Sequence, residues 1–254
     1  MRTIHLIGIG AGDPEHITVQ AVDRLREVDV FFLLDKGDAT KDLVDARRAI
    51  LERHAAGSAY RVVRADDADR DRTPRDYQGT VAEWHLRRAD LYEGLFRDEL
   101  RDGQVGAVLC WGDPTLYDNT IAVVEEVRRR GRVEFDYTVV PGVSSVSALV
   151  AAHRISLNRI GGSVLITTGR RLAADGVPAD VDDVVVMLDA HCAFTRLDDP
   201  DLDIYWGAYL GTPDQLTVAG PLAEVAAGIP PLRDEARARK GWIMDTYLLR
   251  RRRR

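Results

Sequence analysis

Three glycines alternate with other residues in IHLIGIGAGDPEHIT, residues 4–18, directly after an apolar run. A dinucleotide-binding turn has the spacing G-x-G-x-x-G, runs into a helix and is followed by an acid about twenty residues later. Here the glycines are Gly8, Gly10 and Gly12, so the third comes one position early. Pro14 also lacks the amide N–H that a phosphate cradle needs. The turn fits a nicotinamide dinucleotide poorly, and taken alone it is typical of a tight strand-to-helix turn without a ligand.

Two further turns follow apolar runs and carry polar groups. The segment VLCWGDPTLYDNT, residues 108–120, contains a second Gly-Asp-Pro turn, and VVPGVSS, residues 139–145, ends in two serines. A carboxylate and exposed carbonyl oxygens suit a cation or a polar ligand better than a phosphate. Each turn also has a purely structural interpretation, because Gly-Asp-Pro is a common turn and Ser144-Ser145 is a common helix cap. Their joint occurrence favours a site.

A sheet must bring these turns together. Runs rich in β-branched residues alternate with helical patterns up to residue 140. Strands are predicted near 3–9, 29–34, 60–64, 106–111 and 136–140, and helices near 18–28, 40–54, 80–102 and 119–131. This alternation predicts a parallel sheet with helices on both faces. Since the carboxyl ends of parallel strands meet at one edge, both Gly-Asp-Pro turns are expected there.

Local signals define several helix ends. Thr18 is predicted to cap the first helix, and Thr80 with Glu83 has the spacing of a capping box. Gly131 follows three arginines and is predicted to end the helix before it.

The pattern changes after residue 145. Strands are predicted near 163–168, 183–189, 202–210 and 215–220, with fewer and shorter helical patterns between them. The segment 241–251 is typical of a buried strand followed by a basic tail, and Arg250–Arg254 is expected to be solvated. We therefore predict an α/β protein of two α/β domains, 1–140 and 147–254, with a linker at 141–146. Ligands of such proteins bind at the carboxyl ends of the strands, in the cleft between the domains.

Composition limits the classes of partner. Of 254 residues, 45% are hydrophobic and 30% are charged, and the formal net charge is -6, which argues against nucleic acid as a partner. A polyanionic small molecule needs only a local basic patch. The two cysteines, Cys110 and Cys192, have neither metal-ligand nor disulfide spacing, so no metal site is predicted. No signal-peptide or membrane-span pattern is present, so a cytoplasmic protein is expected. The charged segment 64–79 is predicted to be a surface excursion.

The three turns resemble the motifs of the tetrapyrrole methylase family, the methyltransferases of cobalamin and sirohaem synthesis. The family has G-x-G-P-G-D followed by Leu-Thr, then G-D-P, then P-G-x-S-S; this chain has GIGAGDPEHIT with Ala11 in place of the usual proline, then Gly112 to Pro114, then Pro141 to Ser145. The resemblance covers essentially the whole chain. It implies two α/β domains, a homodimer and S-adenosyl-L-methionine in the cleft.

Longer sequence segments indicate which member of the family this chain resembles. They are VFFLLDKG (30–37), WGDPTLYD (111–118), ITTGRRL (166–172), IYWGAYLGTPDQ (204–215) and GWIMDTYLLR (241–250). They are similar to the member that methylates C-1 of precorrin-5 and releases the acetyl group of its substrate as acetate. The resemblance thus implies precorrin-5 as the substrate.

The resemblance also implies cofactor contacts. The Asp113 turn and Leu116 would contact the amino-acid end and the sulfonium side, Ser144 and Ser145 would add polar contacts, and Met187, Leu188, Leu210 and Gly211 would flank the adenosine. From periodicity alone, Met187 and Leu188 are ordinary core residues. The implied set is Ala11, Gly12, Gly112, Asp113, Leu116, Ser144, Ser145, Met187, Leu188, Leu210 and Gly211.

A tetrapyrrole with many carboxylates needs cations at the mouth of its site. Arg170 and Arg171 follow a strand and a Thr-Thr-Gly turn, and Lys36 follows the second strand, so these three are predicted to bind substrate. Each is otherwise a solvated surface charge.

Acetate release needs a general base and a donor for the oxyanion. The candidates are Asp35, Tyr117 and His153, which are otherwise a loop acid, a packed aromatic and a helix-face histidine. No Ser-His-Asp arrangement is evident.

Three other functions remain open at this stage. They are a tetrapyrrole C-methyltransferase acting at another carbon, a nicotinamide-dependent oxidoreductase, and a scaffold that binds S-adenosyl-L-methionine without catalysis. A different methylated position, a cofactor titration and a lack of turnover would identify them, respectively.

Overall fold

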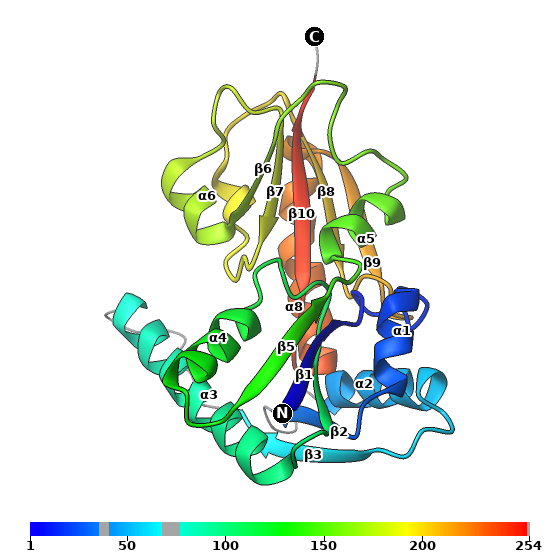
Figure 1. Cartoon of the computed structure of the whole chain (residues 1–254). Coiled ribbons are helices and arrows are strands. Elements are labelled where there is room, and N and C mark those ends of the chain that lie inside the picture. Colours follow the sequence, from blue (N-terminus) through cyan, green and yellow to red (C-terminus); the bar gives the residue numbers. More distant parts are fainter. Residues whose placement is uncertain (36–40, 68–76, 253–254) are drawn as a thin grey trace. The chain divides into compact units, whose positions relative to one another are not determined.

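The computed structural model describes residues 1–35, 41–67 and 77–252. The chain divides into two compact units (Figure 1). The first comprises Met1–Gly10 and Pro14–Val143, and the second comprises Ala11–Asp13 and Ser144–Arg254. A three-residue piece of the first glycine turn therefore belongs to the unit that is otherwise built from the second half of the chain.

The first unit is a parallel α/β sheet. Its strands are β1 (Arg2–Gly8), β2 (Val30–Asp35), β3 (Arg61–Asp66), β4 (Val105–Cys110) and β5 (Phe135–Val140). Its helices are α1 (Val19–Arg26), α2 (Lys41–His54), α3 (Tyr77–Glu99) and α4 (Thr120–Arg130). The strand order is β3-β2-β4-β1-β5, and every pairing is parallel, as the alternating pattern predicted.

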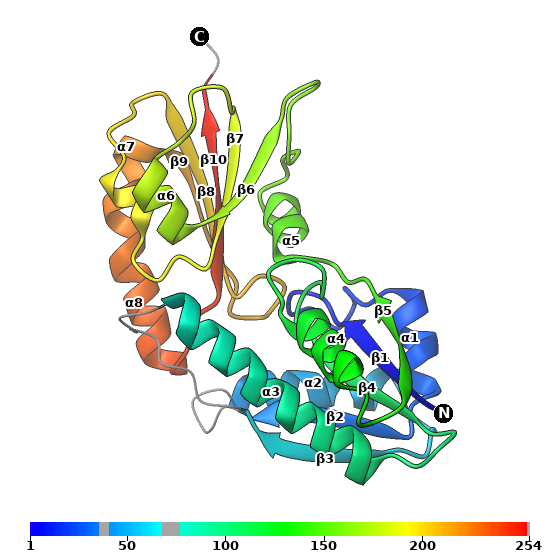
Figure 2. The same cartoon turned by 60° about the vertical axis from the view of Figure 1, so that its left-hand side comes forward.

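Two apolar clusters, one on each face, hold this sheet. One combines α1 and α2 residues such as Leu25 and Ile50 with Phe31 of β2, and the other combines Tyr92 and Phe96 of α3 with strand and α4 residues. Burial of apolar side chains on both faces is the main favourable term for such a sheet. Figure 2 shows α3 and α4 side by side along it.

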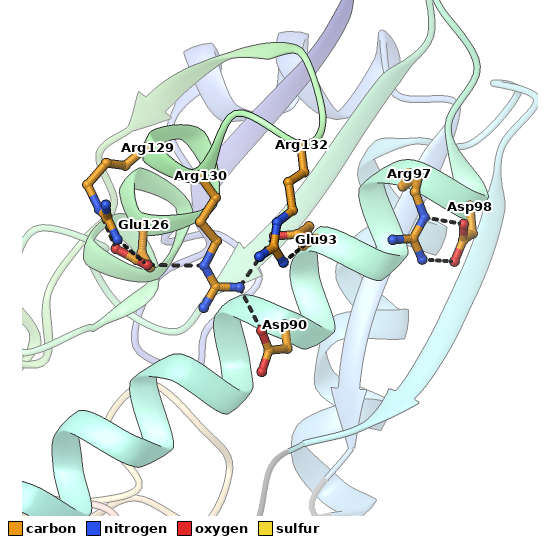
Figure 3. Close-up of polar contacts among 8 residues, drawn as sticks. All are labelled: Asp90, Glu93, Arg97, Asp98, Glu126, Arg129, Arg130 and Arg132. Atoms are coloured by element: carbon orange, nitrogen blue, oxygen red, sulfur yellow. Dashed lines mark hydrogen bonds and ion pairs between the residues drawn. The ribbon is translucent and has the colours of Figure 1, made fainter.

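An ion-pair network joins α3 to α4 (Figure 3). Arg130 contacts Asp90 at 2.6 Å, Glu126 at 3.1 Å and Glu93 at 3.3 Å, and Arg132 contacts Glu93 at 3.3 Å. Glu93 is only 6% exposed, so its charge depends on these partners. Hydrogen bonds from Arg129 and Arg130 lower the pKa of Glu126 to about 2. The network fixes α4, which follows the second Gly-Asp-Pro turn.

The second unit has a mixed sheet. Its strands are β6 (Val164–Thr168), β7 (Asp183–Met187), β8 (Leu202–Ala208), β9 (Leu216–Pro221) and β10 (Asp245–Arg251). Its helices are α5 (Ser145–Ala152), α6 (Gly169–Asp175), α7 (Leu222–Val225) and α8 (Ile229–Lys240), with short 3-10 turns at Ala193–Arg196 and Ala226–Gly228. The order is β6-β7-β10-β8-β9; only β6 and β7 are parallel. Its hydrophobic core includes the large buried side chains of Trp206, Phe194 and Tyr247.

Several sequence predictions for the helices were right and others were wrong. Thr18 accepts a hydrogen bond from the Ala21 N–H as the cap of α1, and Gly131 ends α4 in the left-handed conformation, as predicted. The capping box is wrong, because α3 begins at Tyr77 and Thr80 lies inside it. The helix α8 was missed.

The prediction of a solvated basic tail is wrong for Arg250 and Arg251, whereas Arg252 is exposed as predicted. Arg250 and Arg251 lie in β10 and pair with Asp183 and Asp199, each at 2.5 Å. Asp183 is fully buried, so the arginine neutralises a charge inside the unit. Residues 253–254 lie outside the described residues.

The predicted excursion at 64–79 is also partly wrong. Its first residues belong to β3 and its last to α3. Residues 68–76 lie outside the described residues.

Cys110 and Cys192 are both buried and free. Within the described part of the chain, no group of His, Cys, Asp and Glu is arranged to hold a metal ion, and no helix is long and apolar enough to cross a membrane.

Candidate functional site

The three glycine turns meet at one edge of the first sheet. The strand β1 lies between β4 and β5, so the turns that follow these strands are neighbours. Gly10 N–H donates to the Gly112 carbonyl at 3.3 Å, and Gly112 N–H donates to the Gly10 carbonyl at 2.8 Å. The sequence predicted this convergence.

The turns approach so closely that only glycine fits. A Cβ on Gly142 would lie 2.1 Å from the Gly112 carbonyl oxygen, and one on Gly8 would lie 2.6 Å from the Gly142 nitrogen. Backbone atoms occupy the space that side chains would otherwise fill. The glycines in these motifs therefore pack the three turns against one another.

The turn after β4 presents polar and apolar groups together. Asp113 Oδ1 accepts from the Thr115 N–H at 2.8 Å and from the Thr115 hydroxyl at 2.7 Å. Leu116 is half-buried. Tyr117 has a φ of 51° and is 43% exposed. A left-handed conformation in a bulky residue is strained, and such strain concentrates at functional sites.

Ser144 caps α5. Its Oγ accepts from the Ser147 N–H at 3.2 Å, so the structural interpretation of this serine holds. Ser145 is the first helical residue and is half-buried.

A second set of turns gathers at one edge of the second sheet. Thr168 pairs with Met187, Met187 with Thr246, and Asp245 with Ala208, so the segments after β6, β7 and β8 leave the sheet at the same edge. The residues predicted after these strands therefore lie along the same end of the sheet: Arg170, Arg171, Leu188, Leu210 and Gly211.

Leu188 stands out within this edge. The strand β7 ends at Met187, two residues earlier than predicted, and Leu188 has a φ of 54° and is 66% exposed. Two features of Leu188 cost free energy: its apolar side chain is exposed to water, and its backbone is in the left-handed conformation. Leu188 is therefore not the core residue that periodicity favoured.

The piece of the first turn that belongs to the second unit packs against the segment after β8. A Cβ on Gly12 would lie 2.6 Å from Thr212 Cγ2 and 2.7 Å from the Leu210 carbonyl oxygen. Ala11 and Leu210 are each 4% exposed, and the Gly211 N–H donates to Gln215 Oε1 at 2.9 Å. Ala11 and Leu210 thus offer a ligand little side-chain surface.

A buried polar network lies beneath Leu188, and the sequence did not predict it. The Asp189 carboxylate accepts from the Tyr247 hydroxyl and the Ala193 N–H, each at 2.6 Å, and from the His191 N–H at 3.1 Å. Burial, together with this carboxylate, raises the pKa of Tyr247. The network holds the residue after Leu188 from three directions.

Arg233 of α8 extends that network. Its Nη2 donates to the Asp189 carbonyl at 3.3 Å, and its Nε donates to Asp245 Oδ2 at 2.9 Å. Trp206 Nε1 donates to the same carboxylate oxygen at 3.0 Å. These partners lie far apart in the sequence, so no local pattern could have found them.

Comparison with known proteins identifies the family. Residues 3–226 match the family model of the Tetrapyrrole (Corrin/Porphyrin) Methylases. The chain belongs to this family. A precorrin-6A synthase [deacetylating] from Sinorhizobium sp. is 48% identical over 98% of this chain and 95% of its own length.

Solved structures of tetrapyrrole methylases share the fold. A cobalamin-synthesis-related protein (CobF) from Corynebacterium diphtheriae superposes with a TM-score of 0.81 at 37% identity, covering 99% of both chains. A uroporphyrin-III C-methyl transferase from Thermus thermophilus, complexed with S-adenosyl homocysteine, superposes with a TM-score of 0.58 at 21% identity, covering 97% of this chain and 91% of its own.

The three catalytic candidates of this tetrapyrrole methylase differ in what the structure offers them. Asp35 ends β2, but its side chain lies outside the described residues. His153 Nε2 donates to the Trp206 carbonyl at 3.0 Å, so only Nδ1 is left to accept a proton. Tyr117 is exposed at the turn after β4.

The predicted substrate cations of the methylase are similarly unequal. Lys36 lies outside the described residues. Arg170 and Arg171 are exposed at the start of α6, and Arg171 pairs with Asp175 at 3.1 Å on the same helix. Exposed pairs of this kind are weak, so Arg171 could exchange Asp175 for a substrate carboxylate at little cost.

Proposed function

We propose that this tetrapyrrole methylase transfers a methyl group from S-adenosyl-L-methionine to C-1 of precorrin-5 and releases acetate, giving precorrin-6A. The observation that carries the proposal is the 48% identity to a precorrin-6A synthase [deacetylating] over nearly the full length of both chains. The same rare strings that narrow the resemblance lie at the strand ends of both units.

The groups at these edges suit the proposed cofactor. Asp113 Oδ1 is used by Thr115, while Oδ2 accepts no hydrogen bond from a described residue and is free for the cofactor's ammonium. Leu188 supplies an exposed apolar surface for the adenine ring, held by the Asp189 network. We retain the whole predicted set of cofactor contacts, with Ala11 and Leu210 acting through their backbone.

The cofactor supplies an activated methyl group when bound. Transfer would break the S–CH3 bond of the cofactor while C-1 supplied the electron pair of the new C–C bond, so the residues of this chain need to bind, orient and exclude water rather than act as nucleophiles. The close packing of Gly8, Gly112 and Gly142 suits this role, because a site that positions its ligands must keep its geometry when they bind.

Release of acetate requires further chemistry. Water adds to the acetyl carbonyl, the bond from that carbonyl to the macrocycle breaks, its electron pair stays with the macrocycle, and acetate leaves. We propose Asp35 or His153 Nδ1 as the base that takes the water proton, and the Tyr117 hydroxyl as the donor to the oxyanion. Asp35→Asn and His153→Asn variants should separate the two candidate bases, because loss of the true base blocks acetate release while methyl transfer continues.

We further propose that the enzyme is a homodimer, as the family resemblance implies, and that it is cytoplasmic, as its sequence patterns predict. Light scattering coupled to size-exclusion chromatography would give the mass in solution, and a monomer at micromolar concentration would contradict the dimer.

The central experiment uses methyl-labelled S-adenosyl-L-methionine with precorrin-5, and measures both label in the tetrapyrrole and free acetate. Labelled product with stoichiometric acetate is the expected result. An Asp113→Asn variant should lose cofactor affinity, whereas Asp102→Asn, an exposed acid outside the turns, should not. Methylation without acetate would indicate a tetrapyrrole methyltransferase acting elsewhere, and binding without transfer would indicate a scaffold.

A further inference from the structure

One arginine of the first unit has a guanidinium group that the described residues satisfy only in part. Arg47 lies on α2 and is half-buried. Its Nε donates to the Leu109 carbonyl at 3.3 Å, and its Nη1 donates to the Leu43 carbonyl at 3.1 Å. Its guanidinium lies 5.9 Å from the centre of the Trp111 ring. These contacts put the cation at the carboxyl end of β4, beside the turn that carries Asp113.

This cation is only partly compensated. Burial lowers the pKa of Arg47, and the Asp118 carboxylate opposes this shift only from a distance, because no described carboxylate makes an ion pair with Arg47. Two neutral carbonyls and a ring face satisfy part of the guanidinium. A half-buried charge without a directly contacting carboxylate is costly, and such charges are normally paired.

The third nitrogen of the guanidinium is available. Arg47 Nη2 makes no hydrogen bond with a described residue, and it is not among the buried polar atoms that lack a partner. It therefore retains access to solvent. Since Nε and Nη1 fix the plane of the guanidinium, Nη2 points from a rigid position, which favours recognition of a carboxylate.

We propose that Arg47 binds a carboxylate of the tetrapyrrole substrate through Nη2, and that it does so as a fixed contact, unlike the exposed arginines of α6. This inference rests on the proposed function, because it takes a polycarboxylate macrocycle as the substrate. It adds a residue of the first unit to the predicted substrate set, which otherwise comprises Lys36, Arg170 and Arg171.

The next residue on the helix provides a matched control. Arg48 carries the same charge but is exposed and lines a surface hollow of about 580 Å³ with Glu52, Tyr60 and Arg64, away from the glycine turns. Neutralising Arg48 changes the net charge of the protein by the same amount as neutralising Arg47. A difference between the two variants therefore reports position rather than overall charge.

The test compares Arg47→Gln, Arg47→Lys and Arg48→Gln with the wild type. Uroporphyrin, a stable polycarboxylate macrocycle, is titrated against each protein, and KM for precorrin-5 is measured in parallel. In Arg47→Gln, loss of one charge-assisted hydrogen bond should lower the affinity for uroporphyrin, and raise the KM for precorrin-5, by about tenfold to a hundredfold. Arg47→Lys should lie in between, and Arg48→Gln should match the wild type.

Affinity for S-adenosyl-L-methionine and the unfolding midpoint serve as checks on folding. Should Arg47→Gln unfold, Arg47→Lys decides the question, because it keeps the charge and loses the fixed geometry. Equal uroporphyrin affinity in all four proteins, or no uroporphyrin binding by the wild type, would overturn the role of Arg47. Weakened uroporphyrin binding in a protein that does not methylate precorrin-5 would leave Arg47 standing and reject the proposed function instead.

Discussion

Replacing Gly142 by alanine tests whether the three turns are packed as tightly as the structure shows. The new Cβ would lie 2.1 Å from the Gly112 carbonyl oxygen and 2.9 Å from Gly8 backbone atoms, whereas ordinary contacts begin at 3.4 Å. No side-chain rotation can relieve the overlap, because the opposing atoms are all backbone. At least one turn must move by about 1 Å, well beyond what packed interiors absorb without cost.

The cost can be bounded. Overpacking typically costs about 1–3 kcal/mol, and a contact between backbones belongs at the upper end. The reduced entropy of the unfolded chain returns about 0.4–1 kcal/mol. The net loss of about 2 kcal/mol should lower the unfolding midpoint by roughly 4–8 °C in a chain of this size. Affinity for S-adenosyl-L-methionine should fall as well, because a shift of Gly112 also moves Asp113, the next residue in the same turn.

Differential scanning calorimetry and a cofactor titration would measure the two effects. Gly94→Ala is the matched control in the same unit, since the nearest atom to its new Cβ is 4.0 Å away within α3. It should raise stability by about 0.5–1 kcal/mol. A Gly142→Ala variant that melts with the wild type and binds the cofactor equally well would refute the packing argument.

Three further outcomes follow from the second unit and from the thiols. Leu188→Gly should relieve about 1 kcal/mol of left-handed strain yet weaken cofactor binding, and unchanged affinity would remove Leu188 from the site. Arg250→Met should cost about 3–5 kcal/mol in a denaturant titration, because Asp183 is left charged and fully buried; a loss below about 1 kcal/mol would contradict this. Burial raises the pKa of Cys110 to about 12 and that of Cys192 to about 11, so both thiols should resist iodoacetamide at pH 8 until the protein is denatured.

The first unit was largely predictable because its signals are local. Apolar runs gave the strands, and three glycine turns at strand ends gave the edge where they converge, since parallel strands must finish together. Thr18 and Gly131 were found for the same reason, because a cap involves residues within one helical turn. Thr80 and Glu83 have the spacing of such a signal, but they lie inside a helix that begins at Tyr77.

The remainder depended on contacts between distant residues. The pairing of Asp189 with Tyr247 spans 58 positions, and that of Arg250 with Asp183 spans 67. An arginine-rich run is expected to be solvated unless a buried carboxylate pairs with it. Nothing near Arg250 in the sequence indicates that Asp183 is such a partner. Arg47 was missed similarly, because its environment is made by the end of another strand.

The strand β10 has a consequence for how the protein is made. It is the middle strand of the second sheet, between β7 and β8, and it carries Asp245 and Tyr247 into the polar network. During synthesis, β6 to β9 emerge before the strand that joins them, so β7 and β8 each wait with an unpaired edge. The first unit can form its whole sheet while the ribosome is still translating the second. The second unit closes only when β10 has left the exit tunnel, and until then its apolar faces are the part of the nascent chain that most needs a chaperone.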